Sequence, residues 1–328
     1  MQQYDVAGVG NAIVDVVAPC SDAFLLEHNI AKGVMTLIDE FRADQLYRAL
    51  PGPQQIAGGS AANTMAGLAS LGGKGLFVGK VKADPLGESF AASLRQLGVH
   101  YTTEMATAGP PTACCLIAVT PDGHRSMNTY LGASRELVPV DINEREIAAA
   151  SVLYVEGYLW DAPEAKAAIN KAISAAKTAG RKVAFTLSDP FCVARWREEF
   201  QALLPNLDIL FANEEEAKAL FEVDEFDGAL QRLRSWPGLA ALTRSEKGCV
   251  IARGAELHVL DAMPVAQVVD TTGAGDQFAA GFLYGLTHGH DLPRSGRLGT
   301  LAAAEVISHY GARPETPLGT LAAEAGLF

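Results

Sequence analysis

The sequence lacks the features that would assign it to a membrane or to nucleic acid. It contains no apolar run approaching the roughly 18 residues of a membrane span. Basic residues are not in excess, and the formal net charge is -12 at pH 7. An acidic chain gains nothing from the attraction that draws proteins to nucleic-acid phosphates, so nucleic acid is not an expected partner. A nucleotide is still compatible with this charge if local donors and a divalent cation meet its phosphates.

Cysteine is also scarce, and its pattern does not suggest a disulfide framework. The chain has five cysteines, at positions 20, 114, 115, 192 and 249. Their number is odd and no spacing matches a Cys/His metal site, so we expect reduced thiols in or near a core. The first residues carry no basic segment before an apolar stretch, as a signal peptide would. These absences together predict a cytoplasmic protein without membrane association.

What is present is typical of a large α/β domain. Of the 328 residues, 49% are hydrophobic and 20% charged, an ordinary globular composition. Short apolar runs alternate with amphipathic segments, which predicts a mainly parallel sheet with helices on both faces. The expected buried strands are Val6 to Gly10, Val152 to Val155, Val183 to Leu187, Ile209 to Ala212 and Leu239 to Leu242. The expected helices include Pro163 to Ala179, Glu214 to Phe221 and Phe278 to His288.

Two regions do not follow the alternation of strand and helix. Ile13 to Ala18 and Val34 to Ile38 are strand-like without an expected helix between them, and a Pro121-Asp122-Gly123 turn joins two further strand-like runs. We predict a small antiparallel sheet built from insertions 13–50 and 112–131. Placed over the carboxyl edge of the main sheet, it would serve as a lid.

The strongest chemical signal is the segment from Asp270 to Phe278. Gly273 and Gly275 allow a tight turn that brings backbone N–H groups together just before an amphipathic helix. Such a turn, with the positive end of the helix dipole, suits the charge on a phosphoryl group in transfer. Asp276 lies beside these donors as a candidate proton acceptor. Taken alone, an Asp in such a segment is more often a helix cap.

A second glycine-rich segment, Gly58 to Met65, opens a helix of small residues. Gly58 and Gly59 would let a substrate approach the backbone closely. Asp15 interrupts an apolar strand, and a carboxylate there needs partners; a diol is one, because a carboxylate accepts two hydroxyl protons. A turn or edge carboxylate is the alternative for Asp15, and an ordinary strand-to-helix turn is the alternative for the glycines.

Three further elements have a structural interpretation when they are taken alone. Asn213 and Glu216 fit a helix capping box. Thr243 and Gly248 bound a short loop that could be an ordinary turn. Arg125 belongs to the predicted lid, where it could be a solvated arginine.

The segment Asp-Thr-Thr-Gly-Ala-Gly-Asp-Gln-Phe at 270–278 resembles the carboxy-terminal signature of the ribokinase-like, or PfkB, carbohydrate and nucleoside kinases. The Gly58–Met65 segment resembles the amino-terminal signature of that family. The resemblance covers roughly Val6 to Pro314 and implies a single ribokinase-like domain over 1–328, a three-layer αβα sandwich with a β-sheet lid. The string from Gly8 to Asp15 resembles the adenosine kinase branch most closely.

The resemblance also implies roles for particular residues. Asp276 would be the base, with the N–H groups of Gly273, Ala274 and Gly275 as an anion hole and Arg125 reaching the transferred phosphate. Substrate would contact Asn11, Asp15, Gly58, Gly59 and Asn63. ATP would lie near Asn213, Glu216, Thr243 and Gly248. Glu216 would act on Mg²⁺ through water, and Asp270 and Thr272 would be ligands of a monovalent cation such as K⁺. Ser245 departs from the glycine that the family usually has in the nucleotide loop.

The expected activity is therefore ATP-dependent phosphorylation of an alcohol group on a small molecule. Adenosine, in purine salvage, is the first candidate acceptor. A sugar such as ribose, fructose or 2-keto-3-deoxygluconate is the second, and a non-catalytic binding protein on the same fold is the third. A purine requires an apolar slot in the lid and near Val34 to Phe41, whereas a free sugar requires more polar contacts. The chain could be a monomer or a homodimer.

Overall fold

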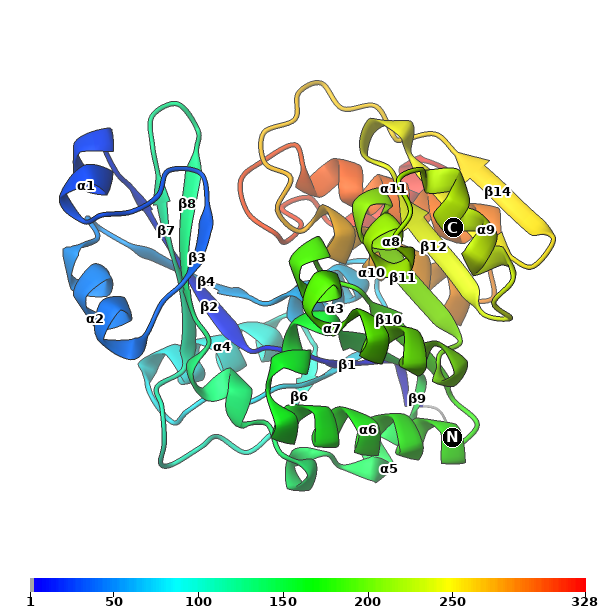
Figure 1. Cartoon of the computed structure of the whole chain (residues 1–328), viewed down its shortest axis with the longest axis horizontal. Coiled ribbons are helices and arrows are strands. Elements are labelled where there is room, and N and C mark those ends of the chain that lie inside the picture. Colours follow the sequence, from blue (N-terminus) through cyan, green and yellow to red (C-terminus); the bar gives the residue numbers. More distant parts are fainter. Residues whose placement is uncertain (1–2) are drawn as a thin grey trace.

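Two β-sheets organise the protein, which we describe over residues 3–328 in a computed structural model (Figure 1). The larger sheet has nine strands in the order β14-β13-β12-β11-β10-β9-β1-β5-β6. Its strands from β12 to β6 are parallel, and β13 and β14 are antiparallel additions at one edge. Their bounds are β1 (Tyr4–Val9), β5 (Gly75–Val78), β6 (His100–Tyr101), β9 (Ala150–Glu156), β10 (Lys182–Thr186), β11 (Ile209–Asn213), β12 (Leu239–Thr243), β13 (Cys249–Arg253) and β14 (Glu256–Leu260). All five strands expected in the parallel sheet are confirmed.

Helices cover both faces of this sheet, as the alternation of strand and helix predicts. On one face lie α5 (Glu144–Ala148), α6 (Pro163–Thr178), α7 (Pro190–Leu203), α8 (Glu214–Phe221) and α9 (Phe226–Arg234). On the other lie α3 (Ser60–Ser70), α4 (Pro85–Gln96), α10 (Ala274–Thr287) and α11 (Leu292–Val306), with α12 (Leu318–Glu324) packed outside them. Alternate residues of β1 divide between these layers: Val6 packs in one core and Ala7 in the other. The result is a three-layer αβα sandwich.

The smaller sheet forms the lid, with strand order β3-β8-β7-β2-β4. Its strands are β2 (Ile13–Pro19), β3 (Met35–Leu37), β4 (Gln54–Gly58), β7 (Ala113–Val119) and β8 (Arg125–Tyr130). The expectation of an antiparallel sheet is wrong in part, because β2 pairs with β7 and β3 with β8 in parallel. Both insertions leave the same edge of a parallel sheet, so their first strands run in the same direction. The sheet also includes β4, beyond the expected limit at residue 50.

Two helices lie on the side of the lid that faces away from the main sheet (Figure 1). They are α1 (Asp22–Glu27), between two strands where no helix was expected, and α2 (Glu40–Ala49). Leu25 and Leu46 from these helices pack with Val14 and Val16 of β2. The alternate residues of β2, among them Asp15, therefore point toward the main domain.

Within residues 3–328, no helix combines the length and the apolar character that crossing a bilayer demands.

Candidate active site

The residues expected to act together gather where the strands of the main sheet end. Asn11 follows β1, Asn213 ends β11 and Thr243 ends β12, while α10 begins nearby. The carboxyl ends of parallel strands share one edge of a sheet, so these side chains lie along the same edge. The lid stands over this edge (Figure 1).

Asp276 does not cap α10. The helix begins at Ala274 with Gly273 as its N-cap, four residues before the expected start at Phe278. The Asp276 carboxylate instead accepts hydrogen bonds from Ser60 Oγ at 2.6 Å and from Asn63 Nδ2 at 3.2 Å, both on α3. Burial raises the pKa of Asp276 to about 6, although the two hydrogen bonds and the charge of Arg313 each lower it. A carboxylate with this pKa is mostly ionised at neutral pH and can still accept a proton.

The turn before Asp276 leaves backbone donors and space for a ligand. Gly273 has φ of 80°, and a Cβ there would lie 2.7 Å from Ala312, so only glycine fits. A Cβ on Gly275 would meet no atom within 4 Å, which shows open space over the first helical turn. The first N–H groups of a helix have no acceptor within it. The N–H of Ala274 is the exception, since it donates to the Thr271 carbonyl at 3.2 Å.

The two glycines before α3 pack closely against the other predicted substrate residues. Gly59 has φ of 93°, and a Cβ there would lie 2.2 Å from the Asn11 carbonyl. A Cβ on Gly58 would lie 2.5 Å from Asp15 Oδ2. The glycines thus let the lid carboxylate and the end of β1 approach the start of α3. Burial raises the pKa of Asp15 to about 6, and the charges of Arg125 and Arg313 oppose that rise.

Glu156, at the end of β9, joins three elements of the site and was not identified from the sequence. It is fully buried. One oxygen accepts from Asn11 N at 2.7 Å and Asn11 Nδ2 at 2.8 Å, and the other accepts from Ala61 N at 2.7 Å. Burial raises its pKa to about 7. An acidic residue directly after the apolar run Val152 to Val155 was the available signal, but nothing local names its partners.

Arg125 and Asp270 form an ion pair between the lid and the main domain. Arg125 Nη1 lies 2.5 Å from Asp270 Oδ2, and the side chains are only 12% and 5% exposed. Asp270 also accepts from Thr272 N, Thr272 Oγ1 and Gly311 N, at 3.0, 2.7 and 3.0 Å. Four donors therefore occupy this carboxylate, and one of them is a cation. The donor set fits a guanidinium and leaves no free carboxylate oxygen for a monovalent cation.

Asn213 and Glu216 form the capping box expected as one of their two interpretations. Asn213 Oδ1 accepts from Glu216 N at 2.8 Å, and Glu216 Oε2 accepts from Asn213 N at 3.0 Å. Asn213 Nδ2 donates to the other oxygen of Glu216 at 2.6 Å. Burial raises the pKa of Glu216 to about 7. No group of three or more His, Cys, Asp or Glu side chains that could hold a metal ion occurs among residues 3–328.

The third residue of the loop from Thr243 to Gly248 has a backbone conformation that favours glycine, the residue expected at this position from the family resemblance. Ser245 has φ of 51°, in the left-handed region. Gly248 has φ of 79°, and a Cβ there would lie 2.0 Å from the Leu260 carbonyl. Arg244 holds the loop through Glu214, with Nε and Oε2 2.8 Å apart. The loop keeps its backbone conformation despite the serine, at a cost in strain.

Ser245→Gly is accordingly expected to stabilise the protein. Relief of the left-handed strain outweighs the greater freedom of glycine in the unfolded chain, for a net gain of about 0.5–1 kcal/mol. Urea unfolding followed by circular dichroism measures it. Gly248→Ala is the matched opposite, expected to destabilise by more, because its Cβ has no room. A Ser245→Gly protein less stable than the parent would contradict this account.

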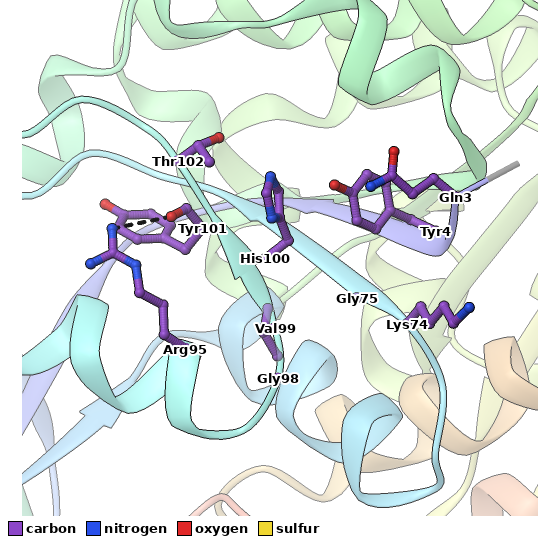
Figure 2. Close-up of a pocket in the computed structure, with 10 residues that line it drawn as sticks. All are labelled: Gln3, Tyr4, Lys74, Gly75, Arg95, Gly98, Val99, His100, Tyr101 and Thr102. Carbon is purple, nitrogen blue, oxygen red and sulfur yellow. Dashed lines mark hydrogen bonds between the residues drawn. The ribbon is translucent and has the colours of Figure 1, made fainter.

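An open depression lies at the other end of the sheet, away from these residues. Its lining includes Gln3, Tyr4, Lys74, Arg95, His100 and Tyr101, and Figure 2 shows Arg95 hydrogen-bonded to the Tyr101 backbone. Tyr4 and Gly75 begin β1 and β5, so the depression borders the amino ends of these strands. Ligands of open α/β sheets bind at the carboxyl ends. The depression is therefore separate from the candidate active site.

Comparisons with known proteins agree with this arrangement. Residues 36–318 match the pfkB family of carbohydrate kinases. A probable sugar kinase from Rhizobium etli CFN 42 is 49% identical, with a TM-score of 0.93 over 100% of both chains. An adenosine kinase from Sinorhizobium meliloti is 51% identical, with a TM-score of 0.92 over 98% of this chain and 99% of that one. An adenosine kinase from Saccharomyces cerevisiae is 28% identical over 92% of this chain and 94% of its own.

The family match spans most of the chain, and the neighbours share its fold over their whole length. Their names divide between nucleoside and sugar kinases, so the shared chemistry is transfer of a phosphoryl group to an alcohol. The chain belongs to the pfkB family of carbohydrate kinases.

Proposed function

We propose that this kinase transfers the γ-phosphoryl group of ATP to the primary hydroxyl of a nucleoside, with adenosine as the preferred acceptor. The observation that carries the proposal is the character of the lid face above the site. Met35, Met127, Ile117 and Val17 are cross-strand neighbours on that face and form what we call the apolar lid row. Ile117 is buried, whereas Met35 is 45% exposed and Leu37 beside it is 48% exposed. Exposed apolar side chains on a face turned toward the site favour a flat, apolar ligand group such as a purine.

Asp15 belongs to the next row of the same face, between Cys115 and Ile56. A nucleoside with its base on the apolar lid row would bring its ribose toward this carboxylate. The two adjacent ribose hydroxyls could then both donate to Asp15. The likeness to the Sinorhizobium meliloti adenosine kinase supports the same acceptor.

The proposed reaction is an in-line displacement. Asp276 accepts the proton of the primary hydroxyl, and the oxygen of that hydroxyl forms a bond to the γ-phosphorus of ATP. The bond between the γ-phosphorus and the oxygen that bridges it to the β-phosphorus breaks, and ADP is released. The N–H groups of Gly273 and Gly275 and the guanidinium of Arg125 stabilise charge on the transferred group. Mg²⁺ bound to the nucleotide would supply further charge neutralisation, near Asn213 and Glu216.

A sugar kinase is the second candidate function. The Rhizobium etli protein, named a probable sugar kinase, is 49% identical over 100% of this chain. A free sugar would use Asp15, Asn63 and the glycines at 58 and 59 and leave the apolar lid row uncovered.

A screen of ATP consumption with Mg²⁺ distinguishes the two acceptors. The compounds are adenosine, inosine, ribose, fructose and 2-keto-3-deoxygluconate. We expect adenosine to give a kcat/KM at least a hundredfold above any sugar, because only a purine covers the apolar lid row. Turnover of a sugar with no turnover of adenosine would overturn the proposal.

Met127→Glu provides the matched variant for this screen. A carboxylate in the apolar lid row would lose its hydration against a bound purine, so KM for adenosine should rise tenfold or more. A small sugar held at Asp15 should be affected much less. An unchanged KM for adenosine would mean that its base does not lie on this row.

A further inference from the structure

Arg313 contacts the candidate base indirectly, through Asn63. It lies in the loop between α11 and α12. Its Nε donates to Asn63 Oδ1 at 3.2 Å, and its Nη1 donates to Ser93 Oγ, on α4, at 3.1 Å. Within the described part of the chain, Nη2 is buried without a partner. The guanidinium therefore bridges α3 and α4 beside the site, with the Nη2 group unused.

The contact with Arg313 decides which way the Asn63 amide points. An asparagine amide has an acceptor end and a donor end. Arg313 is only a donor, so it holds Oδ1, and Nδ2 is left to donate to Asp276 Oδ2 at 3.2 Å. The opposite orientation would set NH₂ against a guanidinium and an oxygen against a carboxylate. Both contacts would be repulsive, so Arg313 makes Asn63 a donor to Asp276.

The surroundings of Asp276 are otherwise mostly acidic. Three carboxyl groups interact with it: Asp15 on β2, Glu156 on β9 and Glu216 on α8. The phenols of Tyr154 and Tyr158 also interact with it, but burial raises the pKa of both, so they are uncharged at neutral pH. Arg313 is the cation that opposes the three carboxyl groups, and its charge lowers the pKa of Asp276. Burial in turn lowers the pKa of Arg313 to about 10, so the guanidinium stays charged at neutral pH.

We propose that Arg313 is a positioning residue for the catalytic base: it fixes Asn63 as a hydrogen-bond donor to Asp276 and, with its own charge, stabilises the carboxylate that has to accept the substrate proton. The proposal rests on the kinase reaction given above and adds to it a residue outside the signature segments. In this proposal Asn63 has a second role besides contact with the substrate, because it links Arg313 to Asp276.

The pH dependence of kcat/KM tests the proposal, with the acceptor that the screen identifies. In the parent enzyme, activity should fall on the acid side around pH 6, where Asp276 becomes protonated. Arg313→Met removes the positive charge and the hydrogen bond to Asn63. The acid limb of the profile, meaning the pH range in which activity falls, should therefore move up by about one pH unit. Activity should then fall roughly threefold at pH 6.5 and be nearly unchanged above pH 9, where the base is ionised in both proteins. An equal loss at every pH would overturn the proposal.

Two variants separate positioning from a structural role. Ser93→Ala removes the other contact of the guanidinium and should leave the acid limb in place. Arg313→Lys keeps the positive charge but cannot bind Asn63 and Ser93 in the same geometry. Its acid limb should therefore lie between that of the parent and that of Arg313→Met. A shift in Ser93→Ala as large as that in Arg313→Met would mean that anchoring the loop matters, not the orientation of Asn63, and would reject the proposal.

A measurement that needs no turnover tests the role of Arg313 separately from the proposed kinase activity. Carbon-13 NMR of aspartate-labelled protein follows the titration of Asp276, whose signal is assigned by its loss in Asp276→Asn. A higher midpoint in Arg313→Met supports the role of Arg313 even if no compound in the screen is phosphorylated. An unchanged midpoint overturns it even if adenosine is a good acceptor.

Discussion

Asp276→Asn is expected to lower kcat by about a thousandfold, within the range for loss of a general base. The asparagine side chain has nearly the same shape and can still accept from Ser60 or Asn63. It cannot take a proton from a hydroxyl at neutral pH. The fall of activity around pH 6 should disappear together with the carboxylate that causes it. Steady-state kinetics from pH 5 to 9 measures both effects.

The variant should remain folded, which makes the loss of rate interpretable. Burial raises the pKa of Asp276 in the folded protein, so the ionised carboxylate reduces stability once the pH exceeds the unfolded value. A neutral amide removes this cost, and Asp276→Asn should be at least as stable as the parent at pH 8. ATP binding, measured by calorimetry, should change little. Near-normal turnover would reject Asp276 as the base.

The second large effect is expected from Arg125→Met. It leaves the Asp270 carboxyl group, which is 5% exposed, without its cation, which should destabilise the protein by about 3 kcal/mol. It also removes a guanidinium proposed to stabilise the transferred phosphate, and kcat should fall by a hundredfold or more. Urea unfolding and steady-state kinetics measure the two losses separately.

The double variant Arg125→Met/Asp270→Asn shows whether the two losses have one origin. The neutral amide no longer needs a cation, so most of the lost stability should return. The rate should stay low, because the guanidinium is still missing. Recovery of kcat together with stability would mean that the single variant lost its rate through the unpaired Asp270 carboxylate, and not through the missing guanidinium.

The main sheet was predictable because its strands are buried on both faces. A strand such as Val152 to Val155 has to be apolar throughout, and that pattern is local in the sequence. The start of α10 was predicted four residues late. Its first turn is Ala274, Gly275 and Asp276, and neither glycine nor the apolar stripe beginning at Phe278 marks a helix start.

The sequence predicted that the lid exists, but it did not predict how the strands of the lid pair. The hairpin of β7 and β8 was visible from its turn residues, since those act over a few positions. The parallel pairing of β2 with β7 joins Ile13 to Ala113, and no local preference encodes such a distant contact. The apolar lid row could be recognised only after that pairing was known.

The sequence by itself determined the family, the parallel core and the identity of Asp276 as the candidate base. Those conclusions depend on residue types at short spacing, and local geometry follows from them. Only the tertiary structure decided that Asp276 is not a helix cap, that Asp270 is paired with Arg125, and that Glu156 and Arg313 belong to the site. Each of these depends on contacts between residues far apart in the chain, and a charge or an amide does not reveal its partner until folding brings the two together.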